Sequence, residues 1–188
     1  VESATLPEGI EEIPEGLFYS NDSSSTSKLK NVTIPESVKS IGRTAFYFCE
    51  SLESITIPAN VTSIGDSAFA YTGLKSITVP ANVTNIEYGV FGYCRELESI
   101  NLETTTIGSG MFNSCTKLTS VEIPSGVTEI GDNAFSRCSN IKRVILPKSV
   151  KKIQFNAFSE CSALRNVYYE GSEEDKKGIT IIDSYSGN

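Results

Sequence analysis

Hydrophobic residues return at fixed offsets along the whole chain. One copy of the pattern, LESITIPANVTSIGDSAF, runs from Leu52 to Phe69 and separates its apolar positions with small or polar residues. Its final residue recurs at intervals of 23, 22, 21, 23 and 23 residues. These repeat positions are Phe46, Phe69, Phe91, Phe112, Phe135 and Phe158. A period in the twenties is typical of a solenoid, in which each unit forms one coil.

Each unit predicts the same short elements. Two apolar residues around a polar one, as in residues 55–57, indicate a short strand with alternating faces. Pro58 follows at a position where six of the seven prolines lie, and because proline donates no backbone hydrogen bond, it ends the strand there. A second apolar pair, Val61 and Ile64, lies three residues apart before a glycine, where a tight turn is expected. The Gly and Ala-Phe-x-x-Cys that follow predict a helical or 3₁₀ turn.

A single coil of this kind is too small to bury its own Phe, Leu and Ile side chains. Stacking the coils at a strand spacing of about 4.8 Å would bury them in one continuous column. We therefore predict an α/β repeat solenoid with a parallel sheet of short strands, short second strands and helical or 3₁₀ turns. About eight coils of 21–23 residues would form a single domain over residues 1–188, with a Ser-rich loop insertion at 19–27.

The phrase Leu-x-x-Ile-x-Ile-Pro-x-x-Val-x-x-Ile-Gly-x-x-Ala-Phe-x-x-Cys resembles the BspA-like, or Treponema-type, leucine-rich repeat. The resemblance covers residues 3 to about 170. It implies the right-handed superhelix of leucine-rich repeats, in which the first strands line a concave face. The end of the chain is similar to that family's closing unit, which implies a C-terminal cap over 167–188 with an acidic helical turn and a last strand.

The resemblance also carries an expectation about function. Proteins of this family are typically secreted or displayed on the surface of host-associated bacteria, where they are implicated in adhesion. We therefore expect a non-enzymatic binding or adhesion module of a secreted or cell-surface bacterial protein, with a host or matrix protein or a glycan as its partner. The alternative interpretation is a structural spacer rod that displays other domains.

Charge and hydropathy remove two classes of partner. The chain has 16 basic and 23 acidic residues, and its net charge of -7 repels a phosphate backbone, so nucleic acid is not expected to bind. No stretch approaches the roughly 18 apolar residues of a membrane span, so this segment is not expected to insert into a membrane. Neither a signal nor an anchor is recognised in it, and the pattern carries no signal for an oligomeric state.

Five cysteines share one position of the repeat, three residues after its Phe. They are Cys49, Cys94, Cys115, Cys138 and Cys161. A metal site and disulfides are both conceivable, because neighbouring coils bring Cα atoms within disulfide range. Zinc sites usually contain paired Cys-x-x-Cys spacings or His ligands, which this chain lacks. We therefore favour an inward ladder of free thiols, and we predict no metal and no cofactor.

The composition also limits catalysis. The chain contains no histidine, so the usual serine and cysteine nucleophile schemes have no base. Carboxylate pairs such as Glu122 with Glu103 or Glu129 could serve a glycoside hydrolase. They would lie on a repetitive, exposed surface with no pocket to raise a carboxyl pKa, so this is the least favoured function and no catalytic residue is predicted.

The residue in the middle of each first strand, and the residue two positions before it, should point outward to the concave face. In the N-terminal part of the chain these positions hold mostly Ser and Thr, which suit a crowded sheet. The last units differ and would place unlike side chains close together: Glu122, Arg143, Ile145, Asn166 and Tyr168. Arg and aromatic side chains are enriched in binding hot spots, so these five residues are the predicted binding site.

Overall fold

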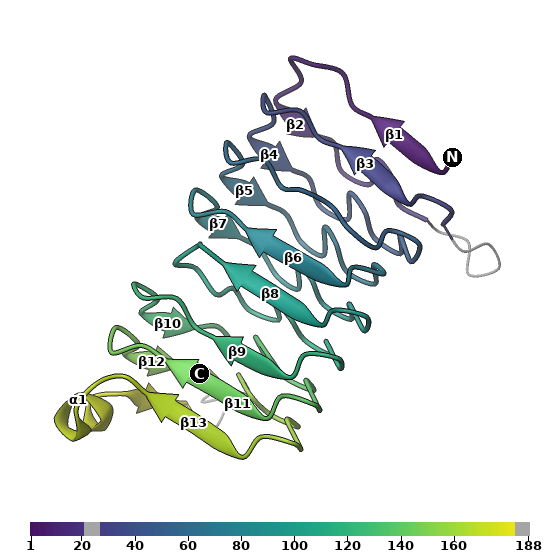
Figure 1. Ribbon diagram of the computed structural model, residues 1–188. Helices are drawn as coiled ribbons and strands as arrows, with labels where there is room; N and C mark the ends of the chain where they lie inside the picture. Colours follow the sequence, from purple (N-terminus) through teal and green to yellow (C-terminus); the bar gives the residue numbers. More distant parts are fainter. Residues whose placement is uncertain (21–26, 183–188) are drawn as a thin grey trace, which may run out of the picture.

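The computed structural model describes residues 1–20 and 27–182. Coils stack in sequence order from β1 at one end to α1 at the other, with the longer first strands along one side of the molecule (Figure 1). The first strands are β1 (Ser3–Thr5), β3 (Asn31–Thr33), β6 (Ser76–Val79), β8 (Ser99–Leu102), β9 (Ser120–Glu122), β11 (Arg143–Leu146) and β13 (Asn166–Tyr169).

Two-residue second strands run along another side of the stack. They are β2 (Glu12–Ile13), β4 (Ser40–Ile41), β5 (Ser63–Ile64), β7 (Asn85–Ile86), β10 (Glu129–Ile130), β12 (Lys152–Ile153) and β14 (Thr180–Ile181). They form one sheet in the order β2-β4-β5-β7 and another in the order β10-β12-β14. In the coil between these sheets, a parallel bridge joins Ile107 to Ile130.

Neighbouring strands pair in parallel, each residue opposite its equivalent in the next coil. In β6 and β8, Ile77 lies opposite Ile100 and Thr78 opposite Asn101. Ile77 is buried whereas Thr78 is exposed, as expected from the alternating pattern. The predicted parallel sheet of short strands and the second strands are therefore confirmed. Residues 54–57 differ, because they do not form a strand, and β8 does not pair with β9. The first strands therefore form three separate sheets, β1-β3, β6-β8 and β9-β11-β13.

The helical or 3₁₀ segment predicted in each coil is not confirmed. Around Phe69, the amides of Ala68 and Ala70 bond within the turn, but the amide of Phe69 donates to the carbonyl of Val90 in the next coil at 2.9 Å. A helix needs consecutive amides to bond within one segment, and here alternate amides join neighbouring coils instead. Tyr71 then takes a left-handed φ of 58°, which ends any helical path. Strands and turns build the described coils, so the α/β class is not confirmed either.

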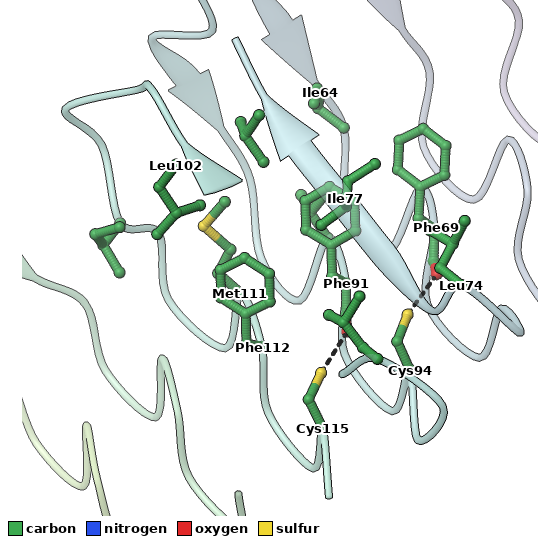
Figure 2. Packing of buried hydrophobic residues seen from close by; sticks show 14 of the residues in the cluster. Ile64, Phe69, Leu74, Ile77, Phe91, Cys94, Leu102, Met111, Phe112 and Cys115 are labelled. Carbon is green, nitrogen blue, oxygen red and sulfur yellow. Dashed lines mark hydrogen bonds between the residues drawn. The ribbon is translucent and has the colours of Figure 1, made fainter. Parts of the chain in front are cut away.

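A column of stacked phenyl rings forms the centre of the core. Successive ring centroids from Phe18 to Phe158 lie 5.0 to 5.4 Å apart, with the planes tilted by 4° to 18°. Figure 2 shows Phe69, Phe91 and Phe112 in this column, with Leu74 and other aliphatic residues packed around it. Phe91 has no solvent exposure. The stack therefore buries the rings continuously, as the repeat predicts.

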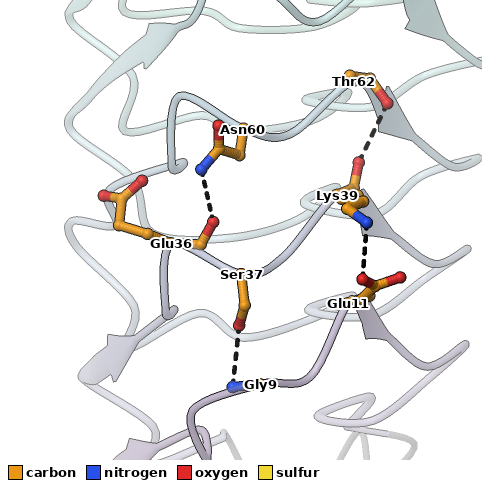
Figure 3. A network of polar contacts seen from close by, with 7 residues as sticks. All are labelled: Gly9, Glu11, Glu36, Ser37, Lys39, Asn60 and Thr62. Carbon is orange, nitrogen blue, oxygen red and sulfur yellow. Dashed lines mark hydrogen bonds and ion pairs between the residues drawn. The ribbon is translucent and has the colours of Figure 1, made fainter.

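Polar side chains join the coils on the outside. Near the N-terminal end, Lys39 Nζ lies 2.6 Å from Glu11 Oε1 in the preceding coil (Figure 3). Thr62 Oγ1 donates to the carbonyl of Lys39, and Asn60 Nδ2 donates to the carbonyl of Glu36 at 2.8 Å. Exposed ion pairs contribute little to stability, so the buried column supplies most of it.

The C-terminal residues follow the expected order of a helical turn and a last strand. Helix α1 (Glu173–Lys177) is N-capped by Ser172, which forms a capping box with Asp175. Strand β14 then pairs with β12. Residues 183–188 of the cap predicted at 167–188, and residues 21–26 of the loop insertion predicted at 19–27, lie outside the described residues.

This end of the stack leaves apolar side chains uncovered. Val167 and Ile181 are 55% and 63% exposed, whereas Val144 and Ile130 in earlier coils are buried. The difference arises because α1 has no buried residue and covers little of the last coil. The described C-terminal residues therefore do not close the core as the earlier coils close one another.

Candidate functional site

The five residues of the predicted binding site lie on three neighbouring strands. The register of β9, β11 and β13 sets Glu122 beside Ile145 and Ile145 beside Tyr168. A second row, two residues earlier in each strand, sets Arg143 beside Asn166. Residues two apart share a face of a sheet, so the structure brings all five together on the outward side. We call these five residues the C-terminal patch.

The C-terminal patch offers varied chemistry to a partner. Glu122, Arg143 and Asn166 are exposed, Ile145 is half-buried, and Tyr168 is 53% exposed. The patch therefore combines a carboxylate acceptor, a guanidinium donor and an amide with an aliphatic side chain and an aromatic ring. Such a mixture suits a protein or glycan surface better than it suits a small charged ligand.

An apolar hollow lies beside the C-terminal patch and was missed by sequence reasoning. It has a volume of about 680 Å³, and Tyr168 is one of its lining residues together with Val144, Phe158 and Ile181. It forms where the last coil and α1 leave the core uncovered. The resemblance predicts a cap over the last coil at this position. The one signal against complete covering of the core is the short acidic helix, because its charged side chains are too polar to bury Ile181.

A second hollow lies in the Ser- and Thr-rich part of the first-strand side. Its volume is about 620 Å³, and Thr33, Thr56 and Thr78 lie along it. It forms where residues 54–57 leave the sheet. Sequence reasoning missed it because residues 52–58 follow the repeat phrase without any change, so no local signal marks the interruption.

The cysteines form the predicted inward ladder of free thiols. All five are buried and none is in a disulfide. Each Sγ donates to the carbonyl of the repeat Phe one coil earlier, for example from Cys94 to Phe69 at 3.1 Å and from Cys115 to Phe91 at 3.2 Å (Figure 2). Burial raises the pKa of Cys94 to about 11 and that of Cys138 to about 12. The thiols are therefore protonated at neutral pH and poor nucleophiles.

Residues 1–20 and 27–182 lack two further features. This part of the chain contains no group of three or more His, Cys, Asp or Glu side chains that could hold a metal ion. It also contains no helix long and apolar enough to cross a membrane.

The carboxylates considered for glycoside hydrolysis occupy separate places. Glu122 lies on β9 and Glu129 on β10, and these strands belong to different sheets. Glu129 accepts a hydrogen bond from Gln154 and lies 3.7 Å from Lys152 Nζ. Glu103 follows the end of β8 and accepts a hydrogen bond from Asn101. The structure therefore does not place Glu122 and Glu129 on one face, as a pair of hydrolytic carboxylates requires.

Parallel strands repeated in register and a stacked column of repeat phenylalanines define the protein as a leucine-rich-repeat solenoid. More specifically, the chain belongs to the BspA-type leucine-rich repeat family. The family model, described as BspA type Leucine rich repeat region, matches residues 1–106 and 97–186 in six copies. The family expected from the repeat phrase is therefore confirmed.

Solved bacterial structures share this fold. A leucine-rich repeat protein from Eubacterium ventriosum is 32% identical, with a TM-score of 0.69 over 80% of this chain and 40% of that chain. The T. pallidum leucine-rich repeat protein is 31% identical, with a TM-score of 0.66 over 71% of this chain and 64% of that one. A leucine-rich cell surface protein from Faecalibacterium prausnitzii is 27% identical, with a TM-score of 0.55 over 100% of this chain and 64% of that one.

The chain is shorter than these relatives. It spans 40% to 64% of the lengths of the three chains. No curated protein matches it. The comparisons thus establish a repeat module of a kind found in bacterial cell-surface proteins.

Proposed function

We propose that this chain is a binding or adhesion module of a secreted or cell-surface bacterial protein, and that it recognises a host or matrix protein or a glycan through the C-terminal patch. The observation that carries the proposal is the register of β9, β11 and β13, which gathers five unlike side chains on one outward face. The description of the F. prausnitzii relative as a cell surface protein supports the location.

The contrast along the first-strand side supports the choice of this patch. Upstream, the outward positions hold Thr33, Thr56 and Thr78, whose short side chains favour strands and offer little contact area. At the C-terminal patch, Arg143 and Tyr168 provide the longer side chains that dominate binding energy in protein interfaces. The neighbouring apolar hollow of about 680 Å³ adds area that a partner could cover.

A binding screen tests this proposal. The purified chain is immobilised and exposed to extracellular matrix proteins and to an array of glycans. We expect at least one ligand with a dissociation constant in the micromolar range or tighter. A screen in which every matrix protein and glycan fails to bind at micromolar concentration contradicts the proposal.

A spacer rod is the second candidate, and the continuous phenylalanine column favours it. Ring stacking runs without a gap from Phe18 to Phe158, which gives a rigid, regular stack of coils. A spacer would need no recognition surface of its own. Substituting Arg143 and Tyr168 would then leave every measured interaction of the protein unchanged.

A further inference from the structure

One first strand at each end of the stack has a free edge. Within the described residues, β1 pairs only with β3 and β13 pairs only with β11, so each has a strand on one side alone. Figure 1 shows β1 and β13 at opposite ends of the molecule, with α1 beyond the end of β13 rather than along its free edge. The unpaired backbone groups of an edge strand are a template on which another chain can pair.

The bonds between coils show which backbone groups lie at the free edge of β1. The carbonyl of Glu2 and the amide of Leu6 both bond to β3. Alternate residues of a strand in a parallel ladder bond to the same neighbour. Ser3 and Thr5 therefore direct their amides and carbonyls away from β3, to the free edge.

The free edge of β13 presents the matching groups. The amides of Asn166 and Glu170 donate to carbonyls of the preceding coil at 3.2 and 2.9 Å. The same alternation leaves the amides and carbonyls of Val167 and Tyr169 at the free edge. If β1 of a second copy lay beside β13 in the register that joins β11 to β13, these groups would meet those of Ser3 and its neighbours in β1.

Apolar side chains lie exposed next to this edge. Val167 is exposed although Val144, its equivalent one coil earlier, is buried, and Val167 lines the apolar hollow of about 680 Å³. In the register described above, Ala4 of the second copy would lie opposite Val167, as Ala4 lies opposite Val32 in its own chain. A second copy would therefore cover apolar surface that a single chain leaves exposed.

The two ends of the stack carry opposite charge. Residues 1–20 contain five acidic residues and no basic one, whereas residues 142–182 contain eight basic and five acidic residues. Contact between two N-terminal ends, or between two C-terminal ends, would bring like charges together. Contact between unlike ends brings acidic residues to basic ones, so the charges select a head-to-tail arrangement.

One repeat position shows how these charges would meet. In the residue just before each first strand, Lys30 Nζ lies 3.3 Å from Glu2 Oε2, and Lys75 Nζ lies 2.6 Å from Glu53 Oε2, each pair joining two neighbouring coils. Arg165 holds this position in the last coil. Docking in register would place Glu2 of the second copy beside Arg165. Because a carboxylate has two acceptor oxygens, Glu2 can bond to Arg165 and keep its own Lys30.

We infer that copies of this chain dock head to tail, with β1 of one copy added in parallel to β13 of another. Pro14 follows β2 and has no amide to donate, so the second strands add less and the first strands carry the contact. Docking leaves one end of each copy free, so further copies can add in the same way. Such a row would present several C-terminal patches to one partner surface, which goes beyond the function proposed for a single patch.

Sedimentation velocity of the purified chain over a wide range of concentrations tests the inference. We expect the average mass to be that of one chain in dilute solution. Dimers and longer assemblies should appear as the concentration approaches about 0.1 mM. Added salt should weaken this association, because the unlike ends attract one another by charge.

Two proline variants each block one edge. Thr5→Pro and Val167→Pro remove amides that point to the free edges, so neither removes a hydrogen bond within its own chain. Each variant alone should stay monomeric, because every junction would then contain a blocked edge. An equal mixture of the two should form dimers and nothing larger, because one junction between the two variants is intact. The matched controls Thr5→Val and Val167→Ile keep their amides and should associate as the parent does.

Arg165→Glu is an independent check that leaves every strand amide in place. It would set two carboxylates beside each other at the junction and should weaken association by about tenfold or more. The circular dichroism of each variant should match that of the parent, so that lost association is distinguished from lost folding.

Four results would overturn the inference. They are a parent chain that stays monomeric up to about 1 mM, dimers formed by one proline variant alone, a mixture of the two proline variants that stays monomeric, and Arg165→Glu chains that associate as strongly as the parent. Dimers of one proline variant alone would mean that like ends meet, or that the contact lies elsewhere on the surface.

Discussion

At the scale of single residues, the position in the repeat decides what a side chain does. Phe91 is fully buried, with ring centroids of Phe69 and Phe112 at 5.3 and 5.4 Å on its two sides. Thr56, at an outward position in the middle of its unit, is exposed. Residues at different positions of the repeat therefore differ completely in their contribution to folding.

This difference predicts unequal effects of truncation. Phe91→Ala should lower the free energy of unfolding by about 3 to 5 kcal/mol, because it opens a cavity between two rings. Thr56→Ala should change it by about 0.5 kcal/mol or less. Urea unfolding followed by circular dichroism measures both values. Equal losses for the two variants would mean that the inward and outward assignment is wrong.

At the scale of the element, the turn is the unit that ties one coil to the next. Alternate amides of the turn donate to carbonyls of the next coil. The cysteine three residues after the repeat Phe donates in the other direction, to the preceding coil, as Cys115 Sγ does to the carbonyl of Phe91. In the shortened coil Thr72 replaces cysteine and donates to the carbonyl of Phe69 at 2.8 Å. Unlike the thiols, this hydroxyl donates within its own coil, so threonine does not reproduce the contact with the preceding coil that cysteine makes.

The buried thiols predict a loss of stability at alkaline pH. A cysteine has an ordinary pKa of 9.0, and burial raises the pKa of Cys94 and Cys161 to about 11. Below pH 9 both folded and unfolded states keep the proton, so the full stability is present. Between these two pKa values, the thiol loses its proton only in the unfolded state. This favours unfolding by about 1 kcal/mol per thiol near pH 10.

Urea midpoints at about pH 8 and about pH 10 measure this effect, and Cys94→Ala is the matched control. The free energy of unfolding should fall between pH 8 and pH 10, and removing one buried thiol should make that fall smaller by about 1 kcal/mol. This holds whatever the substitution does to stability at neutral pH. Thiol reagents should modify the native protein very slowly and all five cysteines once it is denatured. Rapid reaction without denaturant would contradict the buried ladder.

The elements also show what sequence reasoning could and could not reach. The strands around Ile77 and Val144, the phenylalanine column and the inward cysteines all follow from one repeated pattern, because a side chain buried in one coil must be buried in the next. The turn was misassigned because the spacing of Ala68, Phe69 and Thr72 looks helical. Only the structure shows that the amide of Phe69 bonds across coils.

The candidate sites were predictable to different degrees. The C-terminal patch could be predicted because β9, β11 and β13 pair without a slip, so Glu122, Ile145 and Tyr168 keep the alignment of the repeat. The hollow along residues 54–57 depends on a local departure from the sheet, which the spacing of apolar residues does not encode.

At the scale of the whole molecule, one continuous core supports sides that differ from one another. The first-strand side changes from Ser and Thr near β3 and β6 to the mixed chemistry of the C-terminal patch near β13. Since the residues of the C-terminal patch point away from the phenylalanine column, they can be altered without disturbing the fold.

The most direct test of this account compares two double variants with the unsubstituted chain, using the ligand identified in the screen and calorimetry for affinity and melting. Arg143→Ala, Tyr168→Ala removes a base and an exposed aromatic ring from the C-terminal patch. Lys39→Ala, Tyr88→Ala removes the same two kinds of group elsewhere on the surface. We expect the first variant to bind at least about tenfold more weakly and the second to bind normally, with both melting near the parent temperature. Equal affinity of all three proteins would contradict a recognition role for the C-terminal patch.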